Sequence, residues 1–216
     1  MFNERKKLRN GFIVLVTGLF VVLLYSPLAG RVLAQTPLAT SRIAVTAPVS
    51  GNFAVGAQID ANLAAATAPL LAQGSSSGSI VTYVAMLNPQ NVVPNSPMTD
   101  ARGVVGAALA GDRLVVRGSF RELSSAMRNY ATDPVDPPNP NITSAFHVHR
   151  GSPSENGPFQ YALEVTMDNT GRGGSAMGDY TLTPEQLQAL QNGMLYVDLH
   201  TTRNRGGELR GILTPV

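Results

Sequence analysis

Three histidines are the residues of this chain whose type and spacing favour metal chemistry. His147 and His149 form a His-x-His pair, and His200 lies in a second apolar segment near the C-terminus. Imidazoles placed in this way bind copper or zinc in proteins. Because the chain has only three histidines, a carboxylate such as Glu208 or Asp198 would complete the ligand set. The alternative, which is the more frequent outcome for such motifs, is three histidines hydrogen-bonded on a sheet surface.

Both histidine segments are predicted to be β-strands, in which successive side chains face opposite sides. The apolar residues of these segments, among them Phe146, Val148 and Val197, are expected to face the core. The residues between them are then expected to share the outer face: His147, His149, Tyr196, Asp198 and His200. Alternation alone therefore predicts that the three imidazoles lie on one side of a sheet.

The last two strands are predicted to form a hairpin whose register follows from its leucines and charges. If the numbers of paired residues sum to 408, Leu199 faces Leu209 on the core side, and Asp198 faces Arg210 on the outer side. A shift by two residues would oppose Asp198 and Glu208, two like charges. We therefore predict a cross-strand ion pair between Asp198 and Arg210, in a register that also places His200 opposite Glu208.

Arg203, Arg205 and Arg210 cluster around the same hairpin. Such a patch is able to receive an anion or an acidic partner, although a solvated turn is the more common interpretation. The chain has no cysteine, which excludes disulfides, thiol catalysis and cysteine-ligated metals.

Residues 1–34 have the pattern of a secretory signal peptide: a basic start, an apolar middle and small residues before Gln35. An uncleaved anchor that contacts the membrane through residues 11–29 is the alternative. In both cases the following chain is expected outside the cytoplasm, in the periplasm, secreted or on the outer face of a membrane. Five basic residues and one acidic residue precede position 35, so the net charge of +2 becomes −2 for the exported part. This balance argues against a nucleic-acid partner.

The exported part divides into a segment of low complexity and a β-rich domain. Residues 35–79 are predicted to be a tether, or a tether with an added edge strand, because residues 74–79 have the Gly/Ser composition of a linker. Residues 80–216 alternate short apolar runs with turn signals, which indicates an all-β antiparallel sandwich or Greek-key barrel. The proline-rich residues 122–141 are expected to form a long surface loop. One short helix is predicted at about 184–192, where Thr183, Pro184 and Gln186 form a capping box.

Three motifs resemble the CHRD (chordin) domain family. They are Phe146-His147-Val148-His149 with Gly151, the run Tyr196-Val197-Asp198-Leu199-His200-Thr201, and Gly207-Glu208-Leu209-Arg210-Gly211. The resemblance covers about residues 80–216 and implies an immunoglobulin-like β-sandwich in an extracellular protein, without an enzymatic activity. Residues 146–149 also resemble the copper-binding strand of Cu/Zn superoxide dismutases, although the other ligands and the cysteines of that family are missing.

We therefore expect an exported, non-enzymatic binding or structural module on the outer side of a membrane. Its partner would be a protein or a component of the extracellular matrix or cell envelope. Two alternatives stay open: a periplasmic or extracellular protein that binds copper or zinc through its three histidines, and a membrane-anchored accessory subunit of a membrane complex.

Overall fold

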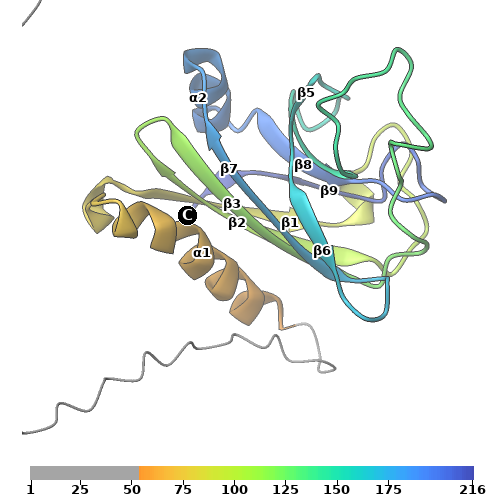
Figure 1. Cartoon of the computed structure of the whole chain (residues 1–216), viewed down its shortest axis with the longest axis horizontal. Coiled ribbons are helices and arrows are strands. Elements are labelled where there is room, and N and C mark those ends of the chain that lie inside the picture. Colours follow the sequence, from red (N-terminus) through yellow and green to blue (C-terminus); the bar gives the residue numbers. More distant parts are fainter. Residues whose placement is uncertain (1–53) are drawn as a thin grey trace, which may run out of the picture. The chain divides into compact units, whose positions relative to one another are not determined.

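The computed structural model describes residues 54–216, and the predicted signal peptide and the first part of the predicted tether lie outside these residues. The described chain forms two antiparallel β-sheets that face one another, with one helix against the outside of the larger sheet (Figure 1). The all-β sandwich expected from the sequence is confirmed. None of the helices within residues 54–216 is long and apolar enough to span a membrane.

The larger sheet has six strands in the order β10-β1-β2-β3-β7-β6. Its strands are β1 (Val81–Leu87), β2 (Arg102–Ala110), β3 (Arg113–Arg121), β6 (Glu164–Met167), β7 (Gly174–Thr181) and β10 (Thr214–Pro215). β2 and β3 form a hairpin, and Ala110 pairs with Arg113 across its turn. Gly111 adopts φ +62° there, a conformation that favours glycine.

The smaller sheet has four strands in the order β5-β4-β8-β9 and carries all three histidine positions at or next to its strands. Its strands are β4 (Phe146–Arg150), β5 (Phe159–Ala162), β8 (Leu195–Leu199) and β9 (Leu209–Ile212). β8 and β9 pair in the predicted register, with Leu199 opposite Leu209 and Asp198 opposite Arg210. The register predicted from leucines and charges is therefore confirmed.

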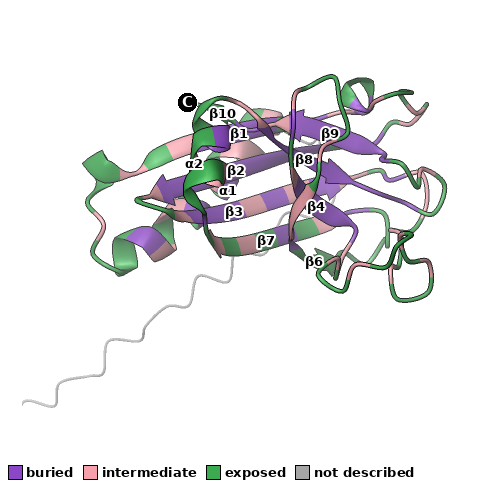
Figure 2. Ribbon diagram, turned by 90° about the horizontal axis from the view of Figure 1, so that it is seen from above, coloured by how far each residue is buried: buried purple, intermediate pink, exposed green. Residues whose placement is uncertain are grey.

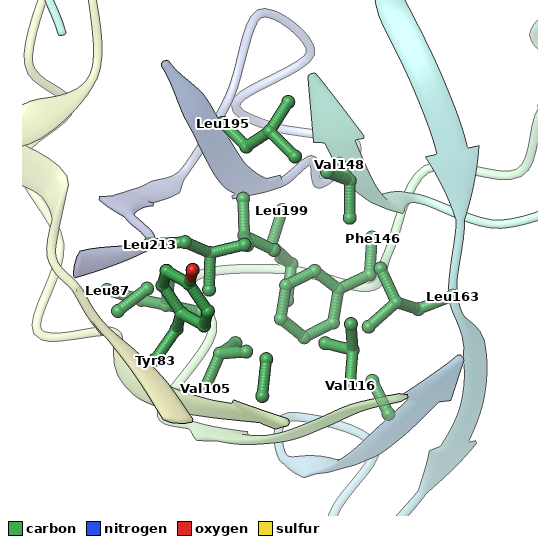
Figure 3. Packing of buried hydrophobic residues seen from close by; sticks show 14 of the residues in the cluster. Tyr83, Leu87, Val105, Val116, Phe146, Val148, Leu163, Leu195, Leu199 and Leu213 are labelled. Atoms are coloured by element: carbon green, nitrogen blue, oxygen red, sulfur yellow. The ribbon is translucent and has the colours of Figure 1, made fainter. Parts of the chain in front are cut away.

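The main core fills the space between the two sheets (Figure 3). Phe146 and Val148 of β4 and the leucines of β8 point into it, as the alternation of side chains predicted. Burial of apolar surface on this scale is the main force that holds the sheets together. Buried residues run through β2, β3, β8 and β9 (Figure 2).

The chain links the two sheets along both sides of the sandwich. On one side β5 and β6 are separated only by Leu163, which is fully buried, so the chain passes directly from the smaller sheet to the larger one. On the other side an isolated bridge joins Asn88, just after β1, to Arg210 of β9.

Helix α2 (Pro184–Gln191) confirms the predicted short helix. The Thr183 side chain accepts a hydrogen bond from the Gln186 backbone N–H, and the Gln186 side chain accepts one from the Thr183 backbone N–H. This reciprocal capping satisfies two backbone donors that the first turn of a helix leaves free.

Helix α1 (Val55–Ala72) occupies much of the segment for which the sequence predicted a tether. It packs on the outer face of β2 and β3 through Ala66 and Leu70, which contact Ala108 and Val115. The helix continues past Pro69, which lies inside it. Its docking depends on small residues on both surfaces, a feature that hydrophobic periodicity does not reveal. Short 3-10 turns follow at Ser77–Ser79 and Pro89–Asn91.

Candidate metal centre

Four side chains with metal-binding atoms meet on the outer face of the smaller sheet. His147 and His149 come from β4, Asp198 from β8, and His200 follows β8 directly. His147 pairs with Asp198 across the two strands, which brings the His-x-His pair beside the second motif. The candidate ligand atoms of the four residues all lie within 4.8 Å of one another. The predicted common face of the three imidazoles is thus present.

One nitrogen of each imidazole donates a hydrogen bond to a backbone carbonyl. A carbonyl oxygen only accepts hydrogen bonds, so this contact shows which nitrogen carries the proton. The three contacts are His147 Nε2 to Ser144 O at 2.6 Å, His149 Nδ1 to Gly157 O at 3.0 Å, and His200 Nδ1 to Arg205 O at 2.9 Å. Protein metal sites commonly orient their histidines in this way.

The remaining nitrogen of each imidazole faces the same carboxylate oxygen, Oδ1 of Asp198. This oxygen lies 3.1 Å from His200 Nε2, 3.3 Å from His149 Nε2 and 3.7 Å from His147 Nδ1. Four ligands placed tetrahedrally about 2.05 Å from a zinc ion would lie about 3.3 Å from one another. The three separations from Asp198 Oδ1 are therefore close to this value, and the four candidate ligand atoms as a set lie within 4.8 Å of one another.

Several of these atoms are buried without a hydrogen-bond partner. Within the described chain this holds for Nε2 of His149, Nε2 of His200 and Oδ1 of Asp198. Buried polar atoms are nearly always paired, and each exception calls for an explanation such as an ion. These three buried atoms converge on one another, which is an arrangement that a bound cation would satisfy.

The environment of the cluster shifts the pKa values of its residues, and for His147 and Asp198 the shift favours the form that can bind a cation. Burial lowers the pKa of His147 to about 4, so this imidazole is neutral near pH 7. Burial would raise the pKa of Asp198, but His200 and His149 outweigh it and hold the pKa of this carboxyl well below its ordinary range. Burial lowers the pKa of His200, yet the attraction of Asp198 raises it overall. Asp198 thus favours the charged form of His200, and His200 favours the charged form of Asp198.

The outer face of the smaller sheet is covered rather than exposed to solvent. Only 2% of His147, 7% of Asp198 and 9% of His200 is accessible. The loop that follows β3 contributes Tyr130, whose ring centroid lies 5.3 Å from that of His147 and 6.4 Å from that of His200. The ring of Phe159 lies 5.4 Å from that of His147. Loops thus cover this face of the smaller sheet, and their backbone carbonyls accept hydrogen bonds from the three imidazoles.

The predicted proline-rich loop is a covering element as well as a surface loop. Its Met127 forms an isolated bridge with Thr201, and Arg128 N–H donates to the His200 carbonyl. A pocket of about 370 Å³ lies beside this loop and is lined in part by Tyr130, Met127 and Ser144. Tyr130 therefore borders both the pocket and the histidine cluster.

Of the two carboxylates proposed as a fourth ligand, Asp198 joins the histidines and Glu208 does not. The Glu208 carboxylate is fully buried and accepts hydrogen bonds from Thr99 Oγ1, Ser124 and Thr201 Oγ1. The ladder between β8 and β9 ends at the pair Leu199 and Leu209. Beyond that pair the segments that follow β8 and precede β9 are no longer paired, so the predicted contact between His200 and Glu208 does not form.

The predicted ion pair between Asp198 and Arg210 is also absent from the described residues, although the two residues pair in register. Arg210 lies with its Cζ 3.6 Å from the centroid of the Tyr196 ring, and the Asp198 carboxylate faces the histidines. The predicted patch of Arg203, Arg205 and Arg210 is wrong in one member, because Arg210 is buried. Arg203 and Arg205 are exposed, and Arg205 binds Asp133.

Sequence reasoning missed the groups that hold the imidazoles in place. Three of them are backbone carbonyls in three different loops, and a carbonyl has no residue type by which to find it. Tyr130 lies in an irregular loop with no periodicity. One residue type does mark such a loop: position 157 requires glycine, because a Cβ there would lie 1.8 Å from the Arg150 carbonyl oxygen.

A family model described as the CHRD domain matches residues 83–213 of the chain. This range contains both strands of the histidine cluster and the final hairpin. Neither a curated protein nor a solved structure matches the chain.

Proposed function

Because the chain belongs to the CHRD domain family, we propose that it is an exported binding module that holds a zinc or copper ion through His147, His149, Asp198 and His200. A CHRD domain is a binding or structural module and is typically extracellular. The metal site adds a specific chemistry to that general role. Imidazole nitrogens with one carboxylate oxygen suit both Zn²⁺ and Cu²⁺.

The observation that supports this proposal is the convergence of unpaired, buried ligand atoms. Three imidazole nitrogens face one carboxylate oxygen at 3.1–3.7 Å, and backbone carbonyls fix the opposite nitrogen of each ring. The ligands come from neighbouring strands of a packed sheet, so their geometry is largely set before an ion binds. Such preorganisation reduces the entropy that binding must overcome.

The experiment is a calorimetric titration of the purified full chain with Zn²⁺ and with Cu²⁺, together with elemental analysis of the protein as purified. We expect one ion per chain. The double variant His147→Ala/His200→Ala should lose this stoichiometric binding. Asp198→Asn, which preserves the side-chain volume, should weaken binding at least about tenfold.

Asp179→Asn is the matched control for Asp198→Asn, since Asp179 lies on a strand of the other sheet and pairs with Arg113. This control should bind metal as the unchanged protein does. Circular dichroism of each variant shows whether the fold is intact. Equal metal content in the unchanged protein and in folded Asp198→Asn and His147→Ala/His200→Ala would overturn the proposal.

The exported location is supported by the signal-peptide pattern of residues 1–34 and by the family. N-terminal sequencing of the protein from cell envelope and medium fractions tests it. A mature chain that begins at Gln35 would establish export and exclude the membrane-anchored accessory subunit. A chain that keeps residues 11–29 and sediments with membranes would favour the anchored form.

The partner we propose is a protein or an envelope component, and the domain itself is proposed to be non-enzymatic. The excess of acidic residues in the exported part disfavours a nucleic acid. A metal-loaded domain that turned over a substrate at useful rates would overturn the non-enzymatic assignment.

A further inference from the structure

Arg210 is a buried cation whose partners surround the metal centre on one side. Only 2% of the residue is accessible. Its guanidinium lies over the ring of Tyr196, donates from Nη1 to Asn156 Oδ1 at 3.2 Å, and donates from Nη2 to the Glu155 carbonyl. Within the described residues it has no carboxylate partner within ion-pair distance. A buried charge is costly to desolvate, and the contacts of the Arg210 guanidinium offset part of this cost.

Tyr196 lies between Arg210 and His149, which is a candidate ligand of the metal centre. Its ring is stacked on that of His149, with 5.2 Å between the centroids and 6° between the planes. Its hydroxyl accepts a hydrogen bond from the Gly157 N–H at 2.9 Å. Arg210, Tyr196 and His149 therefore form a continuous column of side chains.

Gly157 contacts both His149 and Tyr196 through its backbone. Its carbonyl accepts the hydrogen bond from His149 Nδ1, and its N–H donates to Tyr196. A Cβ at this position would lie 1.8 Å from the Arg150 carbonyl oxygen, so the backbone can approach this closely only as glycine. The residues just before it, Glu155 and Asn156, are the ones that Arg210 holds.

We propose that Arg210 is a positioning residue of the metal centre, which acts on His149 through Tyr196 and the segment 155–157. The inference rests on the proposed metal function, but the orientation of His149 exists with or without an ion. Arg210 holds the segment that carries the Gly157 carbonyl, and this carbonyl directs the Nε2 lone pair of His149 toward Asp198. The guanidinium plane and its fork of donors are required, because one ammonium group cannot stack on Tyr196 and reach both acceptors in the same way.

A charge-only role makes the opposite prediction. A positive charge beside a cation site weakens metal binding, so its removal in Arg210→Met would tighten binding and Arg210→Lys would leave binding unchanged. If Arg210 acts by position, both variants weaken Zn²⁺ binding, by about 10–100-fold. Arg113→Lys, in an exposed ion pair of the other sheet, is the matched control and should leave binding unchanged.

A second measurement works on the metal-free protein and separates this inference from the metal proposal. Two-dimensional NMR of ¹⁵N-labelled histidine side chains reports which nitrogen of His149 carries the proton. We expect the Nδ1–H form in the unchanged protein and a mixture of both forms in Arg210→Lys. An unchanged His149 tautomer and unchanged Zn²⁺ affinity in this variant would overturn the inference, even if the protein binds metal.

If Arg210→Lys does not fold, Tyr196→Phe decides the matter. This variant keeps the stacked ring and removes only the hydroxyl that accepts from Gly157. We expect a partial loss of the Nδ1–H form of His149 with an intact fold by circular dichroism. If Tyr196→Phe fully retains the Nδ1–H form of His149, the hydrogen bond between Tyr196 and Gly157 does not help to orient His149, and the inference is contradicted. If the unchanged protein shows the expected tautomer but binds no Zn²⁺ or Cu²⁺, the metal proposal fails and the positioning of His149 stands.

Discussion

Asp198 and Arg210 are direct neighbours across β8 and β9, yet their charged groups face different partners. Asp198 Oδ1 lies 3.1 Å from His200 Nε2, whereas the Arg210 guanidinium lies 3.6 Å from the ring centroid of Tyr196. The Asp198 carboxylate thus contacts the three imidazoles and does not pair with the cation opposite to it on β9. The Asp198 carboxylate therefore belongs to the histidine cluster, and the Arg210 guanidinium does not.

The first prediction concerns metal removal. An ion that binds the folded chain at a concentration about 100 times its dissociation constant stabilises the fold by about 2.7 kcal/mol. For a domain of this size, that energy corresponds to about 5–10 °C in melting temperature. Scanning calorimetry with Zn²⁺, and again after removal of the metal by a chelator, measures the difference. Identical melting temperatures under both conditions would contradict binding by the folded state.

The second prediction concerns Glu208, the carboxylate that lies apart from the histidine cluster. Its two oxygens accept hydrogen bonds from Thr99, Ser124 and Thr201 in a fully buried position. In Glu208→Gln an amide N–H₂ group replaces one acceptor and faces these donors. We expect a loss of about 1–3 kcal/mol in the free energy of unfolding, measured by urea denaturation. Glu164→Gln, at an exposed position of β6, should change it little.

The same carboxylate gives a pH dependence. Burial raises the pKa of Glu208, but the hydrogen bonds from Thr201, Ser124 and Thr99 outweigh it and lower this pKa below the ordinary value of 4.5. The unfolded chain therefore takes up this proton first as the pH falls. The stabilisation by Glu208 is present above pH 4.5 and is lost as the pH falls through the lower pKa of the folded state. Glu208→Gln should flatten this part of the stability profile.

The alternation of side chains and the pairing of leucines were enough to predict the face that carries the candidate metal centre. Phe146 and Val148 have to be buried, which places His147 and His149 on the opposite side of β4. The pairing of Leu199 with Leu209 then fixes which residues of β8 and β9 share that face. These are local or nearest-strand relations, so a single sequence contains them.

The covering of that face was not predictable in the same way. Tyr130 reaches His147 and His200 from an irregular loop, and the Ser144, Gly157 and Arg205 carbonyls belong to three separate loops. Their positions depend on tertiary contacts, which residue types alone do not specify. For this reason the sequence predicted the candidate ligands but left their burial and orientation open.

The third prediction concerns helix α1, which the sequence also missed. A Cβ at Gly106 of β2 would lie 2.8 Å from the backbone nitrogen of Leu63, so the helix must move to accept even a methyl group. Such overpacking costs about 1–3 kcal/mol. We expect hydrogen exchange in α1 to rise about 5–150-fold in Gly106→Ala, as followed by mass spectrometry. Exchange in β4 and β8 is the internal control, and equal acceleration there would indicate global destabilisation instead.

The fourth prediction concerns the path by which an ion leaves. Tyr130 borders both the histidine cluster and the pocket of about 370 Å³. Burial raises the pKa of its phenol to about 12, so near pH 7 the group is neutral and covers the centre without acting as an anionic ligand. In Tyr130→Ala the pocket would open onto the ligands.

We therefore expect Tyr130→Ala to release bound Zn²⁺ several-fold faster than the unchanged protein, as measured by stopped-flow competition with a chromogenic chelator. Tyr130→Phe is the matched control: it keeps the ring over His147 and should release Zn²⁺ at the unchanged rate. Faster release from both variants would mean that the hydroxyl, and not the ring, retains the ion. An unchanged rate in Tyr130→Ala would place the exit elsewhere, because a ring that can be removed without effect does not cover the path.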